Sequence, residues 1–187
     1  MSAQQVTQGL SRRRFLGGCV ACAGSLLVQP AFANLGKTQE RQLAFRHLHT
    51  GEKMQLTYWA EGEYLAESLQ QINHLLRDFR SGESMRMDRN LLDLLYSLQT
   101  SIGKPGEFQI ISAYRSPNTN EMLRRKKRHS GVAKKSLHMQ GKALDIRLSG
   151  VELKQLRKAA IALRSGGVGY YPKSNFIHVD TGHPRSC

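Results

Sequence analysis

Alternating apolar and polar residues mark two strands in the C-terminal half of the chain. In residues 142–148 the apolar side chains fall on one face and Asp145 falls on the other, which is typical of a half-buried strand. Residues 176–180 form a second β-rich run, in which the period of two places His178 and Asp180 on the same face. We therefore expect these polar side chains to lie outside the hydrophobic core.

Apolar residues three and four positions apart predict helices between the strands. The first contains Leu65, Leu69, Ile72, Leu76 and Phe79 and ends near Gly82, the second runs from an Asp88 N-cap to Gly103, and the third begins at a capping box, Ser149–Glu152, and ends before Gly166. A hairpin over 43–59, strands over 107–113 and 168–171, and a polar helix over 118–128 complete the pattern. The sequence thus predicts a single-domain α+β fold, in which a small antiparallel sheet carries the site and helices pack on one face.

The first 33 residues have the pattern of an export signal. Ser11–Leu16 carries twin arginines, residues 16–28 are apolar or small, and Ala31–Ala33 fits a cleavage site. The apolar stretch is shorter than the ~20 residues that span a bilayer, so no stable membrane anchor is expected after cleavage. We predict a twin-arginine signal peptide over residues 1–33 and one domain over residues 34–187, exported to the bacterial periplasm.

Export changes the meaning of the cysteines and of the charge. Cys187 is the only cysteine beyond the signal, so the domain has no internal disulfide. The signal holds three arginines and no acid, so the formal charge falls from +14 to +11. Such a surface favours anionic partners. Export excludes nucleic acid and leaves peptidoglycan carboxylates, other envelope polymers or lipid headgroups, with a solvated basic surface as the alternative.

Residues 136–145 contain the pattern S-x-H-x-x-G-x-A-x-D, which places His138 and Asp145 seven residues apart. His178 follows about thirty residues after this pattern, on the second strand. Two imidazoles and a carboxylate are the ligand set of a catalytic zinc ion that keeps one position for water. The set therefore indicates a zinc hydrolase, and the alternative is a hydrogen-bonded His-Asp pair without a metal.

The pattern resembles the zinc D-Ala-D-Ala peptidases (peptidase family M15) and their lysostaphin-type and hedgehog-type relatives. The similarity extends through residues 110–116 and 166–172, so that residues 48–182 resemble the murein endopeptidase K-like branch. The resemblance implies a hedgehog/DD-peptidase fold, zinc bound by His138, Asp145 and His178, and hydrolysis of cross-links between peptidoglycan stem peptides. The alternatives are a D,D- or L,D-carboxypeptidase, a non-catalytic peptidoglycan-binding zinc domain, and a basic polyanion-binding protein.

Arg115 stands at the end of a predicted strand, where Pro117 stops regular pairing. The resemblance implies that this arginine is catalytic and binds the substrate's peptide or carboxylate, and a structural ion pair is the alternative. Tyr114 and Ser136 are further substrate-binding candidates. Ser136 is equally suited to stabilise a turn.

The general base is the point at which the sequence departs from its relatives. Many of them have a glutamate three residues, or a histidine two residues, before the second histidine ligand, and this chain has Asn175 and Phe176 there. Asp180 is the replacement candidate, about 7 Å from His178 by strand rise. Support of His178 is the alternative role for Asp180. Tyr114 and Tyr170 are candidate proton donors or oxyanion partners.

Overall fold

The computed structural model of the protein describes residues 39–126 and 131–186, and the predicted signal peptide lies outside these ranges. The strands are β1 (Arg41–His47), β2 (Lys53–Ala60), β3 (Glu63–Tyr64), β4 (Glu107–Ser112), β5 (Ala143–Leu148), β6 (Gly167–Tyr171), β7 (Phe176–Asp180) and β8 (Arg185–Ser186). The helices are α1 (Ala66–Leu75), α2 (Arg89–Ile102), α3 (Pro117–Arg125) and α4 (Leu153–Leu163), with short 3-10 helices η1 (Leu137–Gln140) and η2 (Pro172–Ser174).

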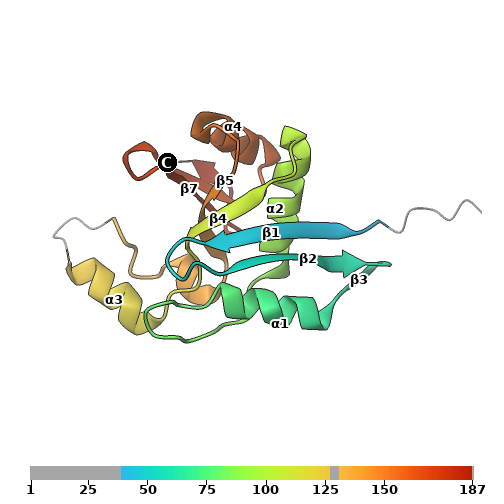
Figure 1. Ribbon diagram of the computed structural model, residues 1–187. Coiled ribbons are helices and arrows are strands. Elements are labelled where there is room, and N and C mark those ends of the chain that lie inside the picture. The colour runs from blue at the N-terminus through green and yellow to red at the C-terminus, as the bar shows by residue number, and fades with distance from the viewer. Residues whose placement is uncertain (1–38, 127–130, 187) are drawn as a thin grey trace, which may run out of the picture. The chain divides into compact units, whose positions relative to one another are not determined.

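One sheet contains all of these strands, in the order β3-β2-β1-β4-β5-β7-β6-β8 (Figure 1). This confirms the predicted α+β fold, but the sheet is mixed and not purely antiparallel. β1 is parallel to β4, and β6 is parallel to β8. Parallel neighbours need a long crossover, and the segment between β1 and β4, which contains α1 and α2, supplies one.

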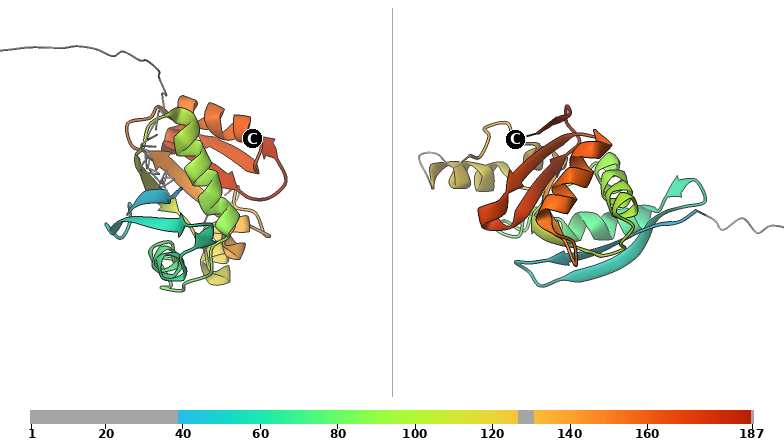
Figure 2. Two further views of the ribbon diagram at one scale, coloured as in Figure 1. Left: turned by 90° about the vertical axis from the view of Figure 1, so that its right-hand side faces the viewer. Right: turned by 90° about the horizontal axis from the view of Figure 1, so that it is seen from above.

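The two faces of the sheet differ because the alternation continues in register from strand to strand. One face carries apolar rows that are almost completely buried, Phe45–Phe108–Leu148 and Ile110–Ile146–Ile177. Each such side chain contributes roughly 1.5–3 kcal/mol through burial. α2 and α4 lie side by side against the sheet, and α1 packs on β2 (Figure 2). Asp145 and His178 have the opposite parity and belong to the other face.

Local signals define α2, whereas a long-range contact ends α1. The Asp88 side chain accepts a hydrogen bond from the Asn90 N–H, and Gly103 closes α2 with a φ of +69°. α1 ends at Leu75, earlier than predicted. The buried Asp78 carboxylate accepts hydrogen bonds from the backbone N–H groups of Arg80 and Ser116, at 3.0 and 2.9 Å, and this holds a turn where the pattern predicts helix.

The start of α4 also differs from the prediction. The helix begins at Leu153, and Glu152 is an N-cap without a side-chain hydrogen bond, so the predicted Ser149–Glu152 capping box is wrong. The Ser149 hydroxyl instead accepts a hydrogen bond from the Gln109 side chain on β4. Within the described ranges, no helix is both long enough and apolar enough to cross a membrane.

Candidate metal centre

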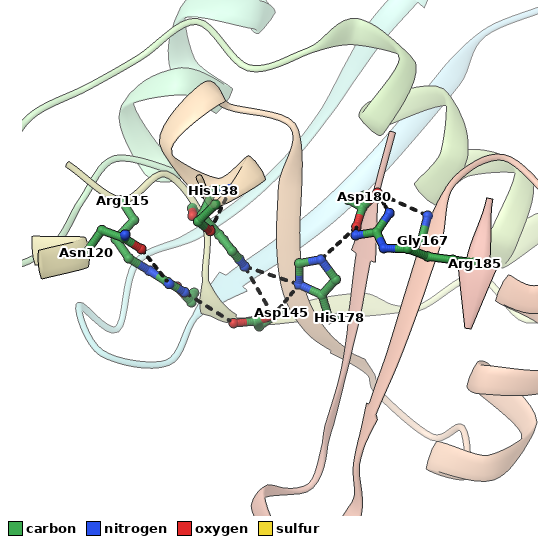
Figure 3. Close-up of polar contacts among 11 residues, drawn as sticks. Arg115, Asn120, His138, Asp145, Gly167, His178, Asp180 and Arg185 are labelled. Carbon is green, nitrogen blue, oxygen red and sulfur yellow. Dashed lines mark hydrogen bonds and ion pairs between the residues drawn. The ribbon is translucent and has the colours of Figure 1, made fainter. Parts of the chain in front are cut away.

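The three predicted ligands lie together on the open face of the sheet (Figure 3). Asp145 on β5 and His178 on β7 are direct cross-strand partners, and His138 reaches them from η1. The His178 Nδ1 atom is 3.0 Å from Asp145 Oδ1, and His138 Nε2 is 3.2 Å from His178 Nδ1. One donor atom from each residue lies within 4.8 Å of the other two. A single metal ion can therefore contact all three residues.

The turn before β5 sets the position of His138. Ser136 caps η1, because its Oγ accepts a hydrogen bond from the His138 N–H at 3.3 Å. Gly141 ends η1 with a φ of +66°, and a Cβ at this position would lie 2.6 Å from the Arg86 carbonyl oxygen. Only glycine fits such a conformation at so close an approach. The glycine of the motif thus turns the chain from one ligand toward the strand that carries the next.

Hydrogen bonds on the far side of each imidazole decide which ring nitrogen faces the cluster. His138 Nδ1 lies 2.7 Å from the Ala113 carbonyl oxygen, so Nδ1 carries the hydrogen and Nε2 keeps its lone pair. His178 Nε2 donates in the same way to Asp180 Oδ2, at 2.9 Å. Two nitrogen lone pairs and a carboxylate oxygen of Asp145 then face one another, and a cation is needed between them. The donor set fits zinc.

The pKa shifts of Asp145 and His178 also indicate that the cluster favours a positive charge. Burial raises the pKa of Asp145, but the opposing effect of His138 and His178 is larger, so the pKa of Asp145 lies well below the usual range. Burial lowers the pKa of His178, but hydrogen bonds with Asp145 and Asp180 raise it to about 9. Without a metal, His178 therefore holds a proton at neutral pH. A metal ion must displace that proton, so metal affinity increases as the pH rises toward 9.

A cleft of about 540 Å³ opens beside the three ligands. Arg115 lines it, and its Nη2 atom is 3.8 Å from Asp145 Oδ2. Asn120 accepts a hydrogen bond from the Arg115 Nη1 atom, at 3.3 Å. Burial lowers the pKa of Arg115, and the charges of Asp145 and Asp78 oppose this effect. Arg115 thus combines the ion pair and the cleft position that the sequence left as alternatives.

The other predicted substrate-binding residues lie in different surroundings. Ser136 lines the cleft, although its hydroxyl already caps η1. Tyr114 is buried and does not line the cleft, and burial, Glu83 and Asp78 raise its pKa. The ring of Tyr170 packs under the Arg157 guanidinium, at 4.8 Å, and also lies outside the cleft lining. The structure therefore brings Ser136, but neither tyrosine, to the cleft.

Asp180 lies behind His178, on the side away from Asp145 (Figure 3). Its carboxylate is completely buried, and both oxygens have several donors. Oδ2 accepts from His178 Nε2 and from Arg185 Nη2, and Oδ1 accepts from the backbone N–H groups of Gly167 and Gly182 and from Arg185 Nη1. Burial raises the pKa of Asp180, but these hydrogen bonds lower it below its usual range. This position matches the supporting role that the sequence left open for Asp180, not that of a base that meets water.

The sequence did not single out Arg185 or the glycines around Asp180. A Cβ on Gly167 would lie 2.5 Å from Asp180 Oδ2, and one on Gly182 would lie 3.0 Å from Oδ1. Arg185 reaches the carboxylate because β8 pairs with β6. No local pattern marks these residues as a group, since they meet only when the C-terminal segment returns to the sheet.

The Asp180→Asn substitution is expected to weaken zinc binding about 10- to 100-fold, the usual cost of losing the partner of a ligating histidine. The Asp180 carboxylate accepts from His178 with one oxygen and from the backbone with the other, whereas an amide has only one oxygen that can accept. Competition with a chromophoric chelator measures the affinity. Asp93→Asn is the matched control, because Asp93 also accepts from an arginine, Arg41, but lies on α2 and outside the cleft lining. Equal zinc affinity of Asp180→Asn and wild type would contradict the supporting role.

The α+β domain and the site on its open face define a candidate metallopeptidase of the hedgehog/DD-peptidase type. The sequence model of the family described as peptidoglycan L,D-endopeptidase MepK, a branch of peptidase family M15, matches residues 36–187. The chain belongs to this family, which confirms the resemblance that residues 48–182 indicated.

Individual relatives agree with the family match. The chain is 44% identical to the peptidoglycan L,D-endopeptidase MepK of Escherichia coli (strain K12) over 176 residues, which cover 94% of this chain and 96% of that protein. It is 40% identical to the probable peptidoglycan L,D-endopeptidase MepK of Haemophilus influenzae over 178 residues, which cover 94% and 95% of the two chains. No solved structure gives a significant match.

Proposed function

We propose that this chain is a zinc-dependent peptidase that hydrolyses the peptide cross-links of peptidoglycan in the bacterial cell envelope. One observation carries the proposal: His138, Asp145 and His178 turn three electron-pair donors toward one point beside an open cleft. The L,D-endopeptidase names of relatives that match almost the whole chain support cross-links of the L,D type. Endopeptidase action then takes precedence over trimming of stem peptides by a carboxypeptidase.

The chain's own residues hold and orient the reacting groups. A zinc ion held by His138, Asp145 and His178 would activate water and polarise the scissile carbonyl. Asp180 keeps His178 in the tautomer that presents Nδ1 to this point. Arg115, which Asn120 holds at the edge of the cleft, offers its guanidinium to a substrate carboxylate or to the peptide itself.

The charge of the cleft supports an anionic substrate. Arg115, Lys135 and Arg185 line the cleft, whereas Asp145 is the only carboxylate among the described residues that do so. Peptidoglycan stem peptides carry free carboxylates, which cationic side chains recognise. Stem peptides are therefore the substrate class that we assign to this cleft.

A non-catalytic, peptidoglycan-binding zinc domain is the second candidate, and the missing base favours it. Asn175 lies in the left-handed conformation at the end of η2, with a φ of +54°, and Phe176 stacks on Tyr171. Neither side chain can take a proton. Apart from the three ligands, the described part of the cleft lining contains no carboxylate and no imidazole.

We further propose that residues 1–33 are a twin-arginine signal peptide and that the domain at 34–187 acts in the periplasm. The family match supports this boundary, because it begins at residue 36, just after the predicted cleavage site. N-terminal sequencing of the protein recovered from a periplasmic fraction tests both statements. A mature protein that begins near Asn34 is expected, and a full-length cytoplasmic protein would contradict the proposal.

Mass analysis of cross-linked muropeptide dimers tests the activity. Dimers with L,D cross-links and dimers with D,D cross-links are incubated with zinc-loaded protein, with chelator-treated protein and with protein reloaded with zinc. We expect monomers from L,D dimers only when zinc is present, with recovery after reloading. Release of single terminal residues would identify a carboxypeptidase. Intact dimers under every condition, with one zinc bound per chain, would favour the non-catalytic domain.

A further inference from the structure

The hairpin formed by β6 and β7 presents four side-chain positions to the cleft beside the ligands. Gly169 is the cross-strand partner of His178, and Tyr171 is the partner of Phe176. These four residues line the cleft. Because His178 is also the partner of Asp145, one row runs across three neighbouring strands as Asp145, His178 and Gly169. The glycine therefore stands next to the ligands, where any other residue would place a side chain.

The space at Gly169 is filled by the phenol of Tyr171. A Cβ on Gly169 would lie 2.9 Å from Tyr171 Cε2 and 3.5 Å from the Tyr171 hydroxyl oxygen. The same Cβ would lie 3.1 Å from the Cβ of His178. The Tyr171 ring thus folds back along β6, and its hydroxyl oxygen lies over the strand pair that carries His178.

Phe176 supports the phenol in this orientation. The Tyr171 ring stacks on Phe176, with ring centroids 4.7 Å apart and an interplanar angle of 20°. Tyr171 nevertheless keeps 46% of its surface exposed. The phenol thus packs on Phe176 and has a surface that a substrate in the cleft can reach.

Peptide hydrolysis develops negative charge on the oxygen of the scissile carbonyl, and a donor aimed at that oxygen stabilises the transition state. Three hydroxyl side chains line the described part of the cleft, those of Ser136, Tyr171 and Ser174. Ser136 is buried and caps η1, and Ser174 belongs to the turn η2 at the end of the hairpin. A tyrosine hydroxyl can donate a hydrogen bond to a carbonyl oxygen.

We propose that Tyr171 is a further catalytic residue of this site, whose hydroxyl donates a hydrogen bond to the oxygen of the scissile carbonyl as charge develops there. Gly169 is the positioning residue that lets the phenol lie beside His178. The inference rests on the proposed peptidase function. It also assigns a role to Phe176, which occupies a position where many relatives carry a base and here supports the phenol.

The Tyr171→Phe variant tests the hydroxyl alone, because the substituted ring can still stack on Phe176. With L,D cross-linked dimers as substrate, kcat is expected to fall about 100-fold, as for loss of one oxyanion donor, while KM changes less than about threefold. Zinc affinity and thermal midpoint are expected to match those of the wild type, which separates a catalytic role from a structural one. An unchanged kcat would overturn the assignment.

Two more variants test the geometry. Gly169→Ala keeps every ligand and the phenol but displaces the ring, so kcat is expected to fall although zinc affinity stays within a few-fold of wild type. Tyr170→Phe is the matched control, because Tyr170 packs against Arg157 outside the cleft, and its kcat is expected to stay within twofold. Equal losses in Tyr170→Phe and Tyr171→Phe would overturn the inference.

The wild-type result separates this inference from the proposed function. A zinc-loaded wild type that cleaves no dimer would overturn the proposed function as well. An active wild type together with a fully active Tyr171→Phe would overturn this inference alone.

Discussion

His138→Ala is expected to abolish detectable zinc binding and to lower cross-link hydrolysis by more than the ~10- to 100-fold that loss of a supporting residue costs. The substitution removes one of three donors, and the remaining two cannot hold the ion against solvent and chelators. The fold is expected to survive, since the imidazole belongs to the open face and its hydrogen bond to the Ala113 carbonyl is worth about 1 kcal/mol.

Three measurements test these expectations. Zinc content after gel filtration reports metal binding, the rate of dimer cleavage reports activity, and the far-UV circular dichroism spectrum reports the fold. His74→Ala is the matched control, because His74 is exposed on α1, away from the cleft lining. The control should retain zinc and activity. Global unfolding of His138→Ala, or retention of stoichiometric zinc, would contradict the placement of this ligand.

Gly166→Ala is expected to destabilise the domain by about 3 kcal/mol or more, although it adds a single methyl group. The added Cβ would lie 1.6 Å from the Asp180 carbonyl oxygen and 2.7 Å from its carbonyl carbon. Both contacts are with backbone, so β7 must move away from the start of β6. This movement shifts Asp180 and, through it, His178.

Equilibrium unfolding in urea measures the loss of stability, and chelator competition measures the accompanying loss of zinc affinity. Ser165→Ala, one residue earlier, is the control, because Ser165 is exposed and its hydroxyl donates to the nearby Leu163 carbonyl. It should cost less than about 1 kcal/mol. If Gly166→Ala were as stable as Ser165→Ala, Gly166 would lie farther from the Asp180 backbone than the structure shows.

Local patterns predicted the parts of the fold that depend on neighbouring residues. Alternation located β5 and β7, and the Asp88 N-cap with Gly103 located both ends of α2, because capping involves residues within one helical turn. The sequence could not predict that α1 ends at Leu75. The contact responsible joins Asp78 to Ser116, which are 38 residues apart.

The candidate site shows the same division. The spacing of His138 and Asp145 around Gly141 predicted that these two candidate ligands lie close together, because a short turn and the strand after it hold both residues. The role of Asp180 was left with two alternatives. Strand parity places it on the same face as His178, but only the return of β8 shows that Gly167, Gly182 and Arg185 surround it.

The two adjacent tyrosines show what parity alone cannot decide. The sequence analysis named Tyr114 and Tyr170 as candidates, whereas the structure brings Tyr171 into the cleft. The choice depends on the register of β6 against β7, in which Gly169 faces His178 and Tyr170 faces the buried Ile177. A shift of one residue would exchange the faces of both tyrosines.

The amino-acid sequence by itself predicted most of the strands and helices, the three candidate zinc ligands, the family resemblance and the export signal, because periodicity, capping and short motifs are properties of neighbouring residues. Only the tertiary structure decided the parallel pairing of β1 with β4, the burial of Asp180 behind His178 and the position of the Tyr171 phenol. These features depend on strand register and on contacts between segments far apart in the chain. No local pattern specifies such contacts, since they arise when the whole sheet forms around one core.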